Sequence, residues 1–383
     1  MIPYGRQSID AADIDAVAEV LRSDFLTQGP AVPRFEDSIA SYCGAAHGVA
    51  VCNATAALHL ACLALGLEPG DKLWTSAITF VASANCGLYC GAEVDFVDID
   101  PQTYNMSVER LAAKLEQAEK AGQLPKVVIP VHLTGQSAEM RQIAELAKRY
   151  GFRIIEDASH AIGGQYEEQP VGDCRYSDIS VFSFHPVKII TTGEGGMAMT
   201  SDAELAARMR LLRSHGITRD ASEFEHEPEG GWHYEQLDLG YNYRMTDIQA
   251  ALGTSQLTRI DEFIGRRREL ARRYDEAFAG MPLVRPRQHA DTQSSWHLYV
   301  IRVDAAVRNR AYLRMRDAGV GVNLHYIPVP RQPYYRALGF NPLLWPEAER
   351  YYAEAITLPL HPGLSEEQQD SVILALKDAL ECA

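Results

Sequence analysis

Lys188 is the residue whose type and setting first suggest chemistry in this chain. It lies in the stretch from Asp178 to Thr200, which reads DISVFSFHPVKIITTGEGGMAMT. One apolar run ends at Phe184 and the next begins at Met197, so the sequence predicts a loop between two buried strands with Lys188 on it. Apolar surroundings disfavour the ammonium form of a lysine and make its amine nucleophilic enough to form a Schiff base. The competing interpretation is a solvated surface lysine, which is the more frequent case.

A carboxylate upstream of Lys188 favours the chemical interpretation. Asp157 follows the apolar stretch from Arg153 to Glu156, and its separation from Lys188 is 188 − 157 = 31 residues. That separation has room for a loop and one strand but not for a strand and a crossover helix, so both side chains are expected at the same rim of one sheet. Pyridoxal phosphate requires an anion that keeps its pyridine nitrogen protonated and an amine that binds its aldehyde. Alternatively, Asp157 only caps a helix or a turn.

A candidate phosphate site precedes both residues in the chain. An apolar strand that starts at Val49 ends at Asn53, and an apolar helix begins at once with Ala54 and Thr55. Small residues in the first turn of a helix leave free backbone N–H groups that an anion can reach, and the Thr55 hydroxyl adds a donor. Asn and Thr also start many helices that bind no ligand.

Strands and helices alternate from Ala31 to about Thr200, which predicts an α/β fold with a mainly parallel central sheet covered on both sides. Apolar faces predict helices at Asp10–Arg22 and Ala138–Tyr150. The predicted strands are Val49–Cys52, Lys72–Thr75, Val94–Val97, Val127–Val131, Arg153–Glu156, Ile179–Phe184 and Met197–Thr200.

The C-terminal third is expected to form a second unit. A proline-free stretch from Thr246 to Ala279 predicts one long helix that bridges two domains. We therefore expect a large cofactor-binding domain over residues 1–250, and the bridging helix with a small α/β domain over residues 251–383. The basic cluster Arg266–Arg268 alternates with acidic residues, so it is expected on a solvated helix face.

The polar segment from Asp220 to Tyr243 interrupts the alternation. It holds His226 and His233 among acidic residues, a combination that can bind a metal ion. Two histidines in a polar loop are more often exposed to solvent, so we expect no metal site.

Composition indicates an ordinary globular protein. The chain has 383 residues, of which 46% are hydrophobic and 23% charged. Its formal net charge of −15 disfavours a general affinity for nucleic acid or anionic membrane, so neither partner is expected. An anionic substrate would then need local donors.

The cysteines and the start of the chain predict a cytoplasmic protein. The seven cysteines are scattered through apolar segments without a C-x-x-C pair, and they are expected to be reduced. The start, MIPYGRQSID, has no apolar core of signal-peptide type, and no apolar run is long enough to span a bilayer.

Five ordered motifs resemble a known family. They read NATAALHLA, AITFVASAN, EDASHA, FSFHPVK followed by GEGG, and GYNYRMTDIQAALG. Together they are similar to the sugar aminotransferases of the DegT/DnrJ/EryC1/StrS family, which are fold type I enzymes that use pyridoxal phosphate. The resemblance covers nearly the whole chain and implies an aspartate aminotransferase-like fold.

The resemblance also implies roles for the residues of the cofactor site. Lys188 would form the Schiff base, Asp157 would partner the pyridine nitrogen, Phe80 would stack on the ring and His160 would lie near the ring hydroxyl. The phosphate would be held by Ala54, Thr55, Ser183 and, from a neighbouring subunit, Asn242.

Substrate contacts are implied at separated stretches, and the shared Asn242 implies a homodimer. The amino donor would be L-glutamate and the acceptor a UDP-linked sugar. The implied substrate-binding residues are Tyr4, Asp24, Phe25, Leu26, Thr27, Ala54, Ser183, Asn242, Leu324, His325 and Tyr326.

Within the family, the motifs LTQGP, RSHGI, SSWHLY and LHYIP look most like the UDP-4-amino-4,6-dideoxy-N-acetyl-β-L-altrosamine transaminases of pseudaminic acid biosynthesis. Other C4 aminotransferases, of the legionaminic, perosamine or Ara4N type, are alternatives. Sugar dehydratases of the family have histidine at the lysine position, so Lys188 disfavours them. A regulator that binds the cofactor without catalysis is a further alternative.

Overall fold

A seven-stranded sheet forms the centre of the structure, a computed structural model that describes residues 1–381. Four neighbouring pairs are parallel and β9 runs antiparallel to both of its neighbours, so the mainly parallel sheet that the sequence predicts is confirmed. In spatial order the strands are β1 (His47–Val51), β9 (Gly196–Thr200), β8 (Ile179–Ser183), β5 (Arg153–Asp157), β4 (Val127–Ile129), β2 (Lys72–Ser76) and β3 (Glu93–Val97).

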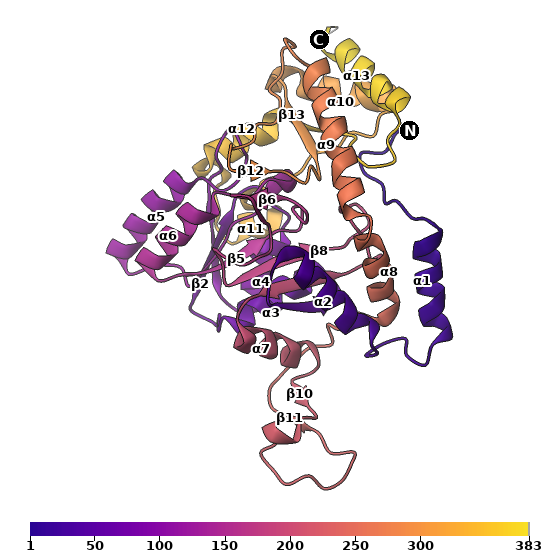
Figure 1. The fold of residues 1–383 in the computed structure, drawn as a ribbon. Coiled ribbons are helices and arrows are strands. Elements are labelled where there is room, and N and C mark those ends of the chain that lie inside the picture. Colours follow the sequence, from indigo (N-terminus) through magenta and orange to yellow (C-terminus); the bar gives the residue numbers. More distant parts are fainter. Residues whose placement is uncertain (382–383) are drawn as a thin grey trace.

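Helices cover both faces of this sheet (Figure 1). Side chains alternate along each strand, so Val49 and Val51 of β1 pack in the cluster with α3 while Ala50 packs in the cluster with α2. One face carries α3 (Ala54–Ala64), α4 (Ala82–Tyr89) and α7 (Ala203–Arg213), and the other carries α2 (Ala31–Cys43), α5 (Val108–Ala121) and α6 (Met140–Tyr150).

The C-terminal part has its own apolar core around a two-stranded antiparallel sheet. This core lies at the end of the molecule that holds both chain termini (Figure 1). The domain boundary at residue 250 stays a prediction. The elements of this part are β13 (Tyr299–Arg302), α10 (Ala305–Asp317), α11 (Pro333–Ala337), α12 (Pro346–Glu354), β14 (Ala355–Leu358) and α13 (Glu366–Glu381).

The long helix predicted over Thr246–Ala279 is wrong as a single element. Two helices, α8 (Asp247–Leu257) and α9 (Ile260–Ala277), meet at Thr258 and Arg259. The Thr258 hydroxyl donates to the Ser255 carbonyl at 2.7 Å, and the Arg259 guanidinium pairs with two aspartates of the N-terminal segment. These contacts end α8 and hold α1 (Ala11–Arg22) against it. The helix predicted at Asp10–Arg22 is confirmed, except that Asp10 is its N-cap and the helix begins at Ala11.

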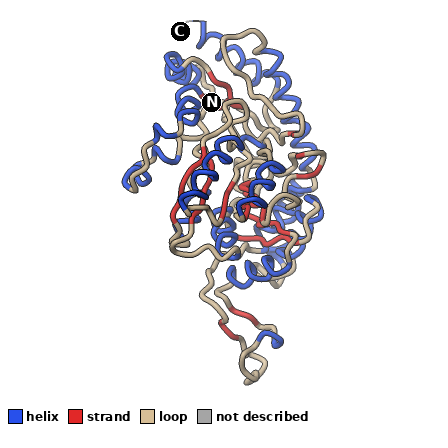
Figure 2. Tube along the Cα trace, turned by 90° about the vertical axis from the view of Figure 1, so that its left-hand side faces the viewer, coloured by secondary structure: helices blue, strands red, loops and turns tan. Residues whose placement is uncertain are grey.

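Segment 214–243 forms an arm whose outer part stands away from the body in both views (Figures 1 and 2), whereas Tyr241 and Tyr243 near its end pack against the central core. It contains the short strands β10 (Ile217–Thr218) and β11 (Glu235–Gln236) and a 3-10 turn at Ala221–Glu223. His226 and His233 both contact the Glu235 carboxylate. Within residues 1–381 no cluster of three or more potential ligands is placed to hold a metal ion.

The remaining short elements are β6 (Gln165–Tyr166), β7 (Gln169–Pro170), β12 (Thr292–Gln293) and 3-10 turns at Leu133–Gly135, Val329–Arg331 and Pro342–Leu344. The six cysteines of the described chain are free thiols, and Cys382 lies outside the described residues. No helix in residues 1–381 has the length and apolarity needed to cross a membrane.

The solvated face expected for the basic cluster is wrong for its central residue. Arg267 is 1% exposed, and its Nη1 donates to the carbonyls of Trp296, His297 and Leu360 at 3.2, 3.1 and 2.9 Å. Burial lowers its pKa to about 9. One guanidinium therefore joins α9 to the chain before β13 and to the chain after β14.

Replacing Arg267 should destabilise the protein, because it leaves three buried carbonyls without a donor. We expect Arg267→Met to lower the free energy of unfolding by about 3 kcal/mol in urea titrations. Arg272→Met, on the same helix but with a 64% exposed side chain, is the matched control and should change it by less than about 0.5 kcal/mol. Equal effects of the two substitutions would contradict the bridging role of Arg267.

Candidate active site

A cavity of about 400 Å³, the Lys188 cavity, opens where β5 and β8 end. Nine residues that the sequence analysis names as site residues line it, brought together from five separate stretches of chain. They are Ala54, Thr55, Phe80, Asp157, His160, Ser183, Lys188, His325 and Tyr326.

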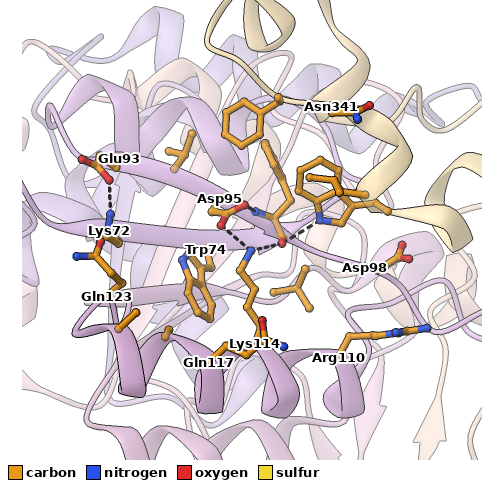
Figure 3. Close-up of a pocket in the computed structure, with 18 of the residues that line it drawn as sticks. Lys72, Trp74, Glu93, Asp95, Asp98, Arg110, Lys114, Gln117, Gln123 and Asn341 are labelled. Atoms are coloured by element: carbon orange, nitrogen blue, oxygen red, sulfur yellow. Dashed lines mark hydrogen bonds and ion pairs between the residues drawn. The ribbon is translucent and has the colours of Figure 1, made fainter.

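A larger cavity of about 680 Å³ lies at the far edge of the sheet, between β3, α5 and the segment before α12 (Figure 3). Lys114 lies there over the Trp74 ring, 4.7 Å from its centroid, and pairs with Asp95 at 2.6 Å. This cavity contains no residue that the sequence analysis names as a site residue. Its central amine is already paired, so it is not a candidate for the chemistry.

Lys188 stands on the loop that joins β8 to β9. Its backbone N–H donates to the His185 carbonyl at 2.9 Å, and the following Ile189 and Ile190 are buried. Burial lowers the pKa of Lys188 to about 8, although the charge of Asp157 acts in the opposite direction. A substantial share of this amine is therefore neutral close to physiological pH.

Asp157 ends β5, and its carboxylate is fixed from two sides. It accepts hydrogen bonds from the Ser83 hydroxyl at 2.6 Å and from the Ser159 backbone N–H at 3.2 Å. The residue is 5% exposed. Asp157 therefore presents a held negative charge to the cavity, as the spacing argument predicts for the rim it shares with Lys188.

The start of α3 forms a donor-rich corner of the cavity. The Asn53 side chain accepts from the Ala56 N–H at 2.8 Å, which leaves the N–H groups of Ala54 and Thr55 without intrahelical acceptors. Behind them runs β9. A Cβ added to Gly196 would lie 2.6 Å from the Ala54 nitrogen, so only glycine lets β9 support this corner so closely.

Three histidines in and around the cavity are held neutral. Burial, followed by the charge of Lys188, lowers the pKa of His160 well below its usual range. The same two causes lower the pKa of His325 to about 3, and the His297 ring lies 4.4 Å from the His160 ring with its pKa also well below normal.

The hydrogen bonds of His160 settle which of its nitrogens carries the proton. Its Nδ1 accepts from the Thr134 N–H at 3.3 Å, so the proton of the neutral ring is on Nε2. Nε2 lies 3.1 Å from the Tyr326 hydroxyl oxygen and donates to it. The Tyr326 hydroxyl proton is thereby left for a further acceptor.

Other implied site residues do not line the cavity. Tyr4 lies beside it, with its ring centroid 5.2 Å from that of His325, and Leu324 packs against the adjoining core. Asn242 is exposed on the arm's return strand, opposite Ser214.

The stretch of Asp24, Phe25, Leu26 and Thr27 lies between α1 and α2 and contacts the start of α8. Thr27 pairs with Thr246, and Phe25 is 53% exposed. This stretch therefore does not line the Lys188 cavity of its own chain, although the family resemblance implies that it binds the substrate.

Sequence analysis missed several residues of the site. Ser83 and Ser159 hold Asp157, but a serine within an apolar helix or after a strand carries no distinctive signal. The sequence analysis treats Asn53 as the end of a strand and as a residue type that starts helices, but it does not name Asn53 as a site residue. The other lining residues not named beforehand are Leu58, Thr79, Ala82, Val131, His185 and Glu194.

The donor set fits pyridoxal phosphate at each of its three functional groups. Free N–H groups and hydroxyls at the start of α3 suit a phosphate, the fixed Asp157 suits a protonated ring nitrogen, and the partly neutral Lys188 suits an aldehyde. Phe80 is 56% exposed beside the cavity, which leaves its face available for a ring.

Comparison with known proteins agrees with this fit. The profile of the DegT/DnrJ/EryC1/StrS aminotransferase family matches residues 7–377. The spore coat polysaccharide biosynthesis protein SpsC of Bacillus subtilis (strain 168) is 39% identical over 389 residues, which cover 100% of this chain and 98% of SpsC.

Solved structures are similar over the full chain. The putative sugar aminotransferase Spr1654 from Streptococcus pneumoniae, in its PMP form, has a TM-score of 0.91 and 33% identity, covering 100% of both chains. Helicobacter pylori PseC, an aminotransferase involved in the biosynthesis of pseudoaminic acid, has a TM-score of 0.90 and 31% identity, also covering 100% of both. Spr1654 is also solved in a PLP form. The predicted fold type I architecture and the predicted cofactor are confirmed.

The pKa of Lys188 predicts how cofactor capture depends on pH. We expect the rate at which cofactor-free protein captures added pyridoxal phosphate to rise through about pH 8, because the neutral amine is the nucleophile. Asp157→Asn removes the charge that raises this pKa, so the midpoint should move to lower pH. Stopped-flow absorbance measures the rate, and Lys148→Ala, at an exposed lysine, is the control. A rate independent of pH would exclude Lys188 as the titrating amine.

Proposed function

This chain belongs to the DegT/DnrJ/EryC1/StrS aminotransferase family, and from that premise we propose the reaction that it catalyses. It is a sugar aminotransferase that uses pyridoxal phosphate. We propose that it moves an amino group from L-glutamate to C4 of a UDP-linked 4-keto-6-deoxy-N-acetylhexosamine of β-L-arabino configuration. The product would be UDP-4-amino-4,6-dideoxy-N-acetyl-β-L-altrosamine.

The observation that carries the proposal is the convergence of Lys188, Asp157 and the start of α3 on one cavity beside His325 and Tyr326. Lysine at position 188 favours amination over dehydration, and an intact set of cofactor contacts favours an enzyme over a regulator. Support for the particular sugar comes from the motifs that resemble one branch of the family and from the position of Tyr4 next to His325.

Pyridoxal phosphate, when bound, supplies an aldehyde carbon and an electron sink. Lys188 Nζ, with its pKa of about 8, can take the proton from the α-carbon of glutamate in one half-reaction and give a proton to C4 of the sugar in the other. The Asp157 carboxylate is held in a fixed position in the cavity by the hydrogen bond that the Ser83 hydroxyl donates to it. The neutral His160 directs the Tyr326 hydroxyl proton toward the cavity, where it suits an oxygen of the sugar.

We also propose that the active protein is a homodimer with shared sites. Asn242 and the stretch from Asp24 to Thr27 lie outside the Lys188 cavity of their own chain, and Asn242 is exposed. If they serve a cofactor and a sugar, as the family motifs imply, they must serve the cavity of a second copy. A two-fold arrangement gives two equivalent composite sites.

The higher identity to SpsC keeps one alternative open: the same C4 chemistry on another nucleotide sugar that enters a surface polysaccharide. Legionaminic, perosamine and Ara4N types belong to this alternative. Recognition of the epimer depends on pocket geometry, so a substrate panel decides between them.

The proposed reaction is tested by offering matched 4-keto sugars with L-glutamate. We expect the UDP-linked β-L-arabino compound to be aminated at C4 faster than the D-xylo epimer and faster than dTDP or GDP analogues, as measured by product mass spectrometry. Lys188→Ala should abolish turnover and the visible absorbance of covalently bound cofactor. Amination at C3, or faster turnover of a substrate without a nucleotide, would overturn the proposed substrate.

Shared sites are tested by mixing inactive protomers. A heterodimer of Lys188→Ala and Asn242→Ala chains should recover up to half of one dimer's activity, because one of its sites has both residues intact. The control pair, Lys188→Ala with Asp157→Asn, should recover nothing, since both residues belong to the same chain's cavity. No recovery in a verified Lys188→Ala and Asn242→Ala heterodimer would contradict sharing.

A further inference from the structure

The loop between β4 and α6, residues 130–139, carries a non-glycine residue in a left-handed conformation. Thr134 has φ 64° and ψ −4°, a region that favours glycine and that a β-branched residue adopts only where its surroundings hold it there. In this conformation the Thr134 N–H donates to His160 Nδ1 at 3.3 Å. The groups that hold Thr134 therefore also bear on His160, which lines the Lys188 cavity.

The Thr134 N–H decides which nitrogen of His160 carries the proton. His160 Nε2 contacts the Tyr326 hydroxyl, which can either donate or accept, so this contact is compatible with both tautomers. A backbone N–H can only donate, so its contact with Nδ1 excludes a proton there. Without Thr134 the proton could lie on Nδ1, and Nε2 would then accept the Tyr326 hydroxyl proton. The direction of the Tyr326 donor thus depends on one backbone group.

The side chain of His132 closes the loop around Thr134. The His132 ring is fully buried, and its Nδ1 accepts from the Ala138 N–H at 3.1 Å. The His132 backbone N–H donates to the Asp157 carbonyl at 3.0 Å. Since Nδ1 accepts, the proton of the neutral ring is on Nε2, which donates to Glu156 Oε2 at 2.6 Å. His132 is therefore fixed at its ring and at its backbone.

Glu156 holds His132 from the face of the sheet opposite to the cavity. Neighbouring residues of a strand point to opposite faces, so Glu156 of β5 faces away from the cavity that Asp157 lines. Glu156 is 5% exposed, and its second carboxylate oxygen accepts from the Ser177 hydroxyl. A charged acceptor makes a stronger hydrogen bond than a neutral one, so this carboxylate fixes the His132 ring firmly.

We infer that Glu156 is a positioning residue of the aminotransferase: through His132 it keeps Thr134 in its left-handed conformation, and Thr134 keeps the His160 proton on Nε2. The two adjacent acids of β5 thus serve one site from the two faces of the sheet. The effect on the tautomer is independent of the substrate. Its consequence at the sugar rests on the proposed function, since it requires the Tyr326 hydroxyl to meet a sugar oxygen.

The tautomer of His160 is measured by NMR of the holoenzyme with isotope-labelled histidine nitrogens, assigned with His160→Asn. We expect an unprotonated Nδ1 in the wild type. Glu156→Leu removes the acceptor of His132 and should give a mixture of both tautomers, whereas Glu156→Gln keeps an oxygen acceptor and should retain the wild-type signals. Glu36→Leu is the matched control, at a buried acid that accepts from the Ala50 N–H at 2.8 Å, and should leave the tautomer unchanged.

A double-mutant cycle tests whether the effect reaches the sugar through Tyr326. Glu156→Leu should raise the KM of the best keto sugar of the panel roughly threefold to tenfold, the range expected for one neutral hydrogen bond. In Tyr326→Phe, which lacks the hydroxyl, Glu156→Leu should raise this KM no further. A general disturbance of the fold would act equally in both backgrounds. If Glu156→Leu does not fold, His132→Asn replaces it, because the asparagine oxygen can still accept from the Ala138 N–H but does not reach Glu156.

Each outcome decides the question. An unchanged His160 tautomer in folded Glu156→Leu, or in His132→Asn in its place, overturns the inference, as does an equal change in Glu36→Leu. A further rise in KM when Glu156→Leu is added to Tyr326→Phe overturns the route through Tyr326. If the tautomer changes as expected but no keto sugar is aminated, the positioning role of Glu156 stands and the proposed function fails.

Discussion

The balance between the burial of Lys188 and the charge of Asp157 is the constraint on which the site depends. Burial alone would drive the amine to its neutral form, and the carboxylate alone would keep it charged. The fold of the backbone determines both the burial of Lys188 and its distance from Asp157. Asp157 ends β5, Lys188 follows the adjacent β8, and the buried Ile189 and Ile190 hold the loop against the core. The nearby charge of Asp157 partly offsets the effect of burial, and the resulting pKa of Lys188 is about 8, where the amine both gains and loses protons readily.

The same balance explains why the cavity uses neutral imidazoles. A buried charge costs several kcal/mol unless it is paired, and the carboxylate of Asp157 already faces Lys188. His160 and His325 therefore act as dipoles, and their hydrogen bonds to Tyr326 and Thr357 fix their orientation. In a protein of net charge −15, such neutral donors can hold an anionic substrate without a cluster of buried cations.

Sequence patterns predicted the sheet and the spacing of Lys188 and Asp157 because both depend on local apolar runs. The break between α8 and α9 was not predictable in this way, since Arg259 is drawn to Asp13 from 246 residues away in the sequence. The solvent exposure expected for Arg267 was wrong for a similar reason. Its carbonyl partners come from loops that follow it in the chain, and a charged run gives no sign that one member is buried. Ser83 likewise serves Asp157 only because α4 and β5 meet in the fold.

Arg267 also connects the C-terminal core to the substrate side of the cavity. Its guanidinium donates to the His297 carbonyl, the His297 ring lies against His160, and His160 orients Tyr326. The cofactor side of the cavity, by contrast, is built from β5, β8 and α3 of the central sheet. The side that carries His325 and Tyr326 also rests on the central core, because Leu324 and Tyr326 pack against the same apolar cluster as α3, β5 and β8. Arg267 therefore adds a second support to this side, from the C-terminal core.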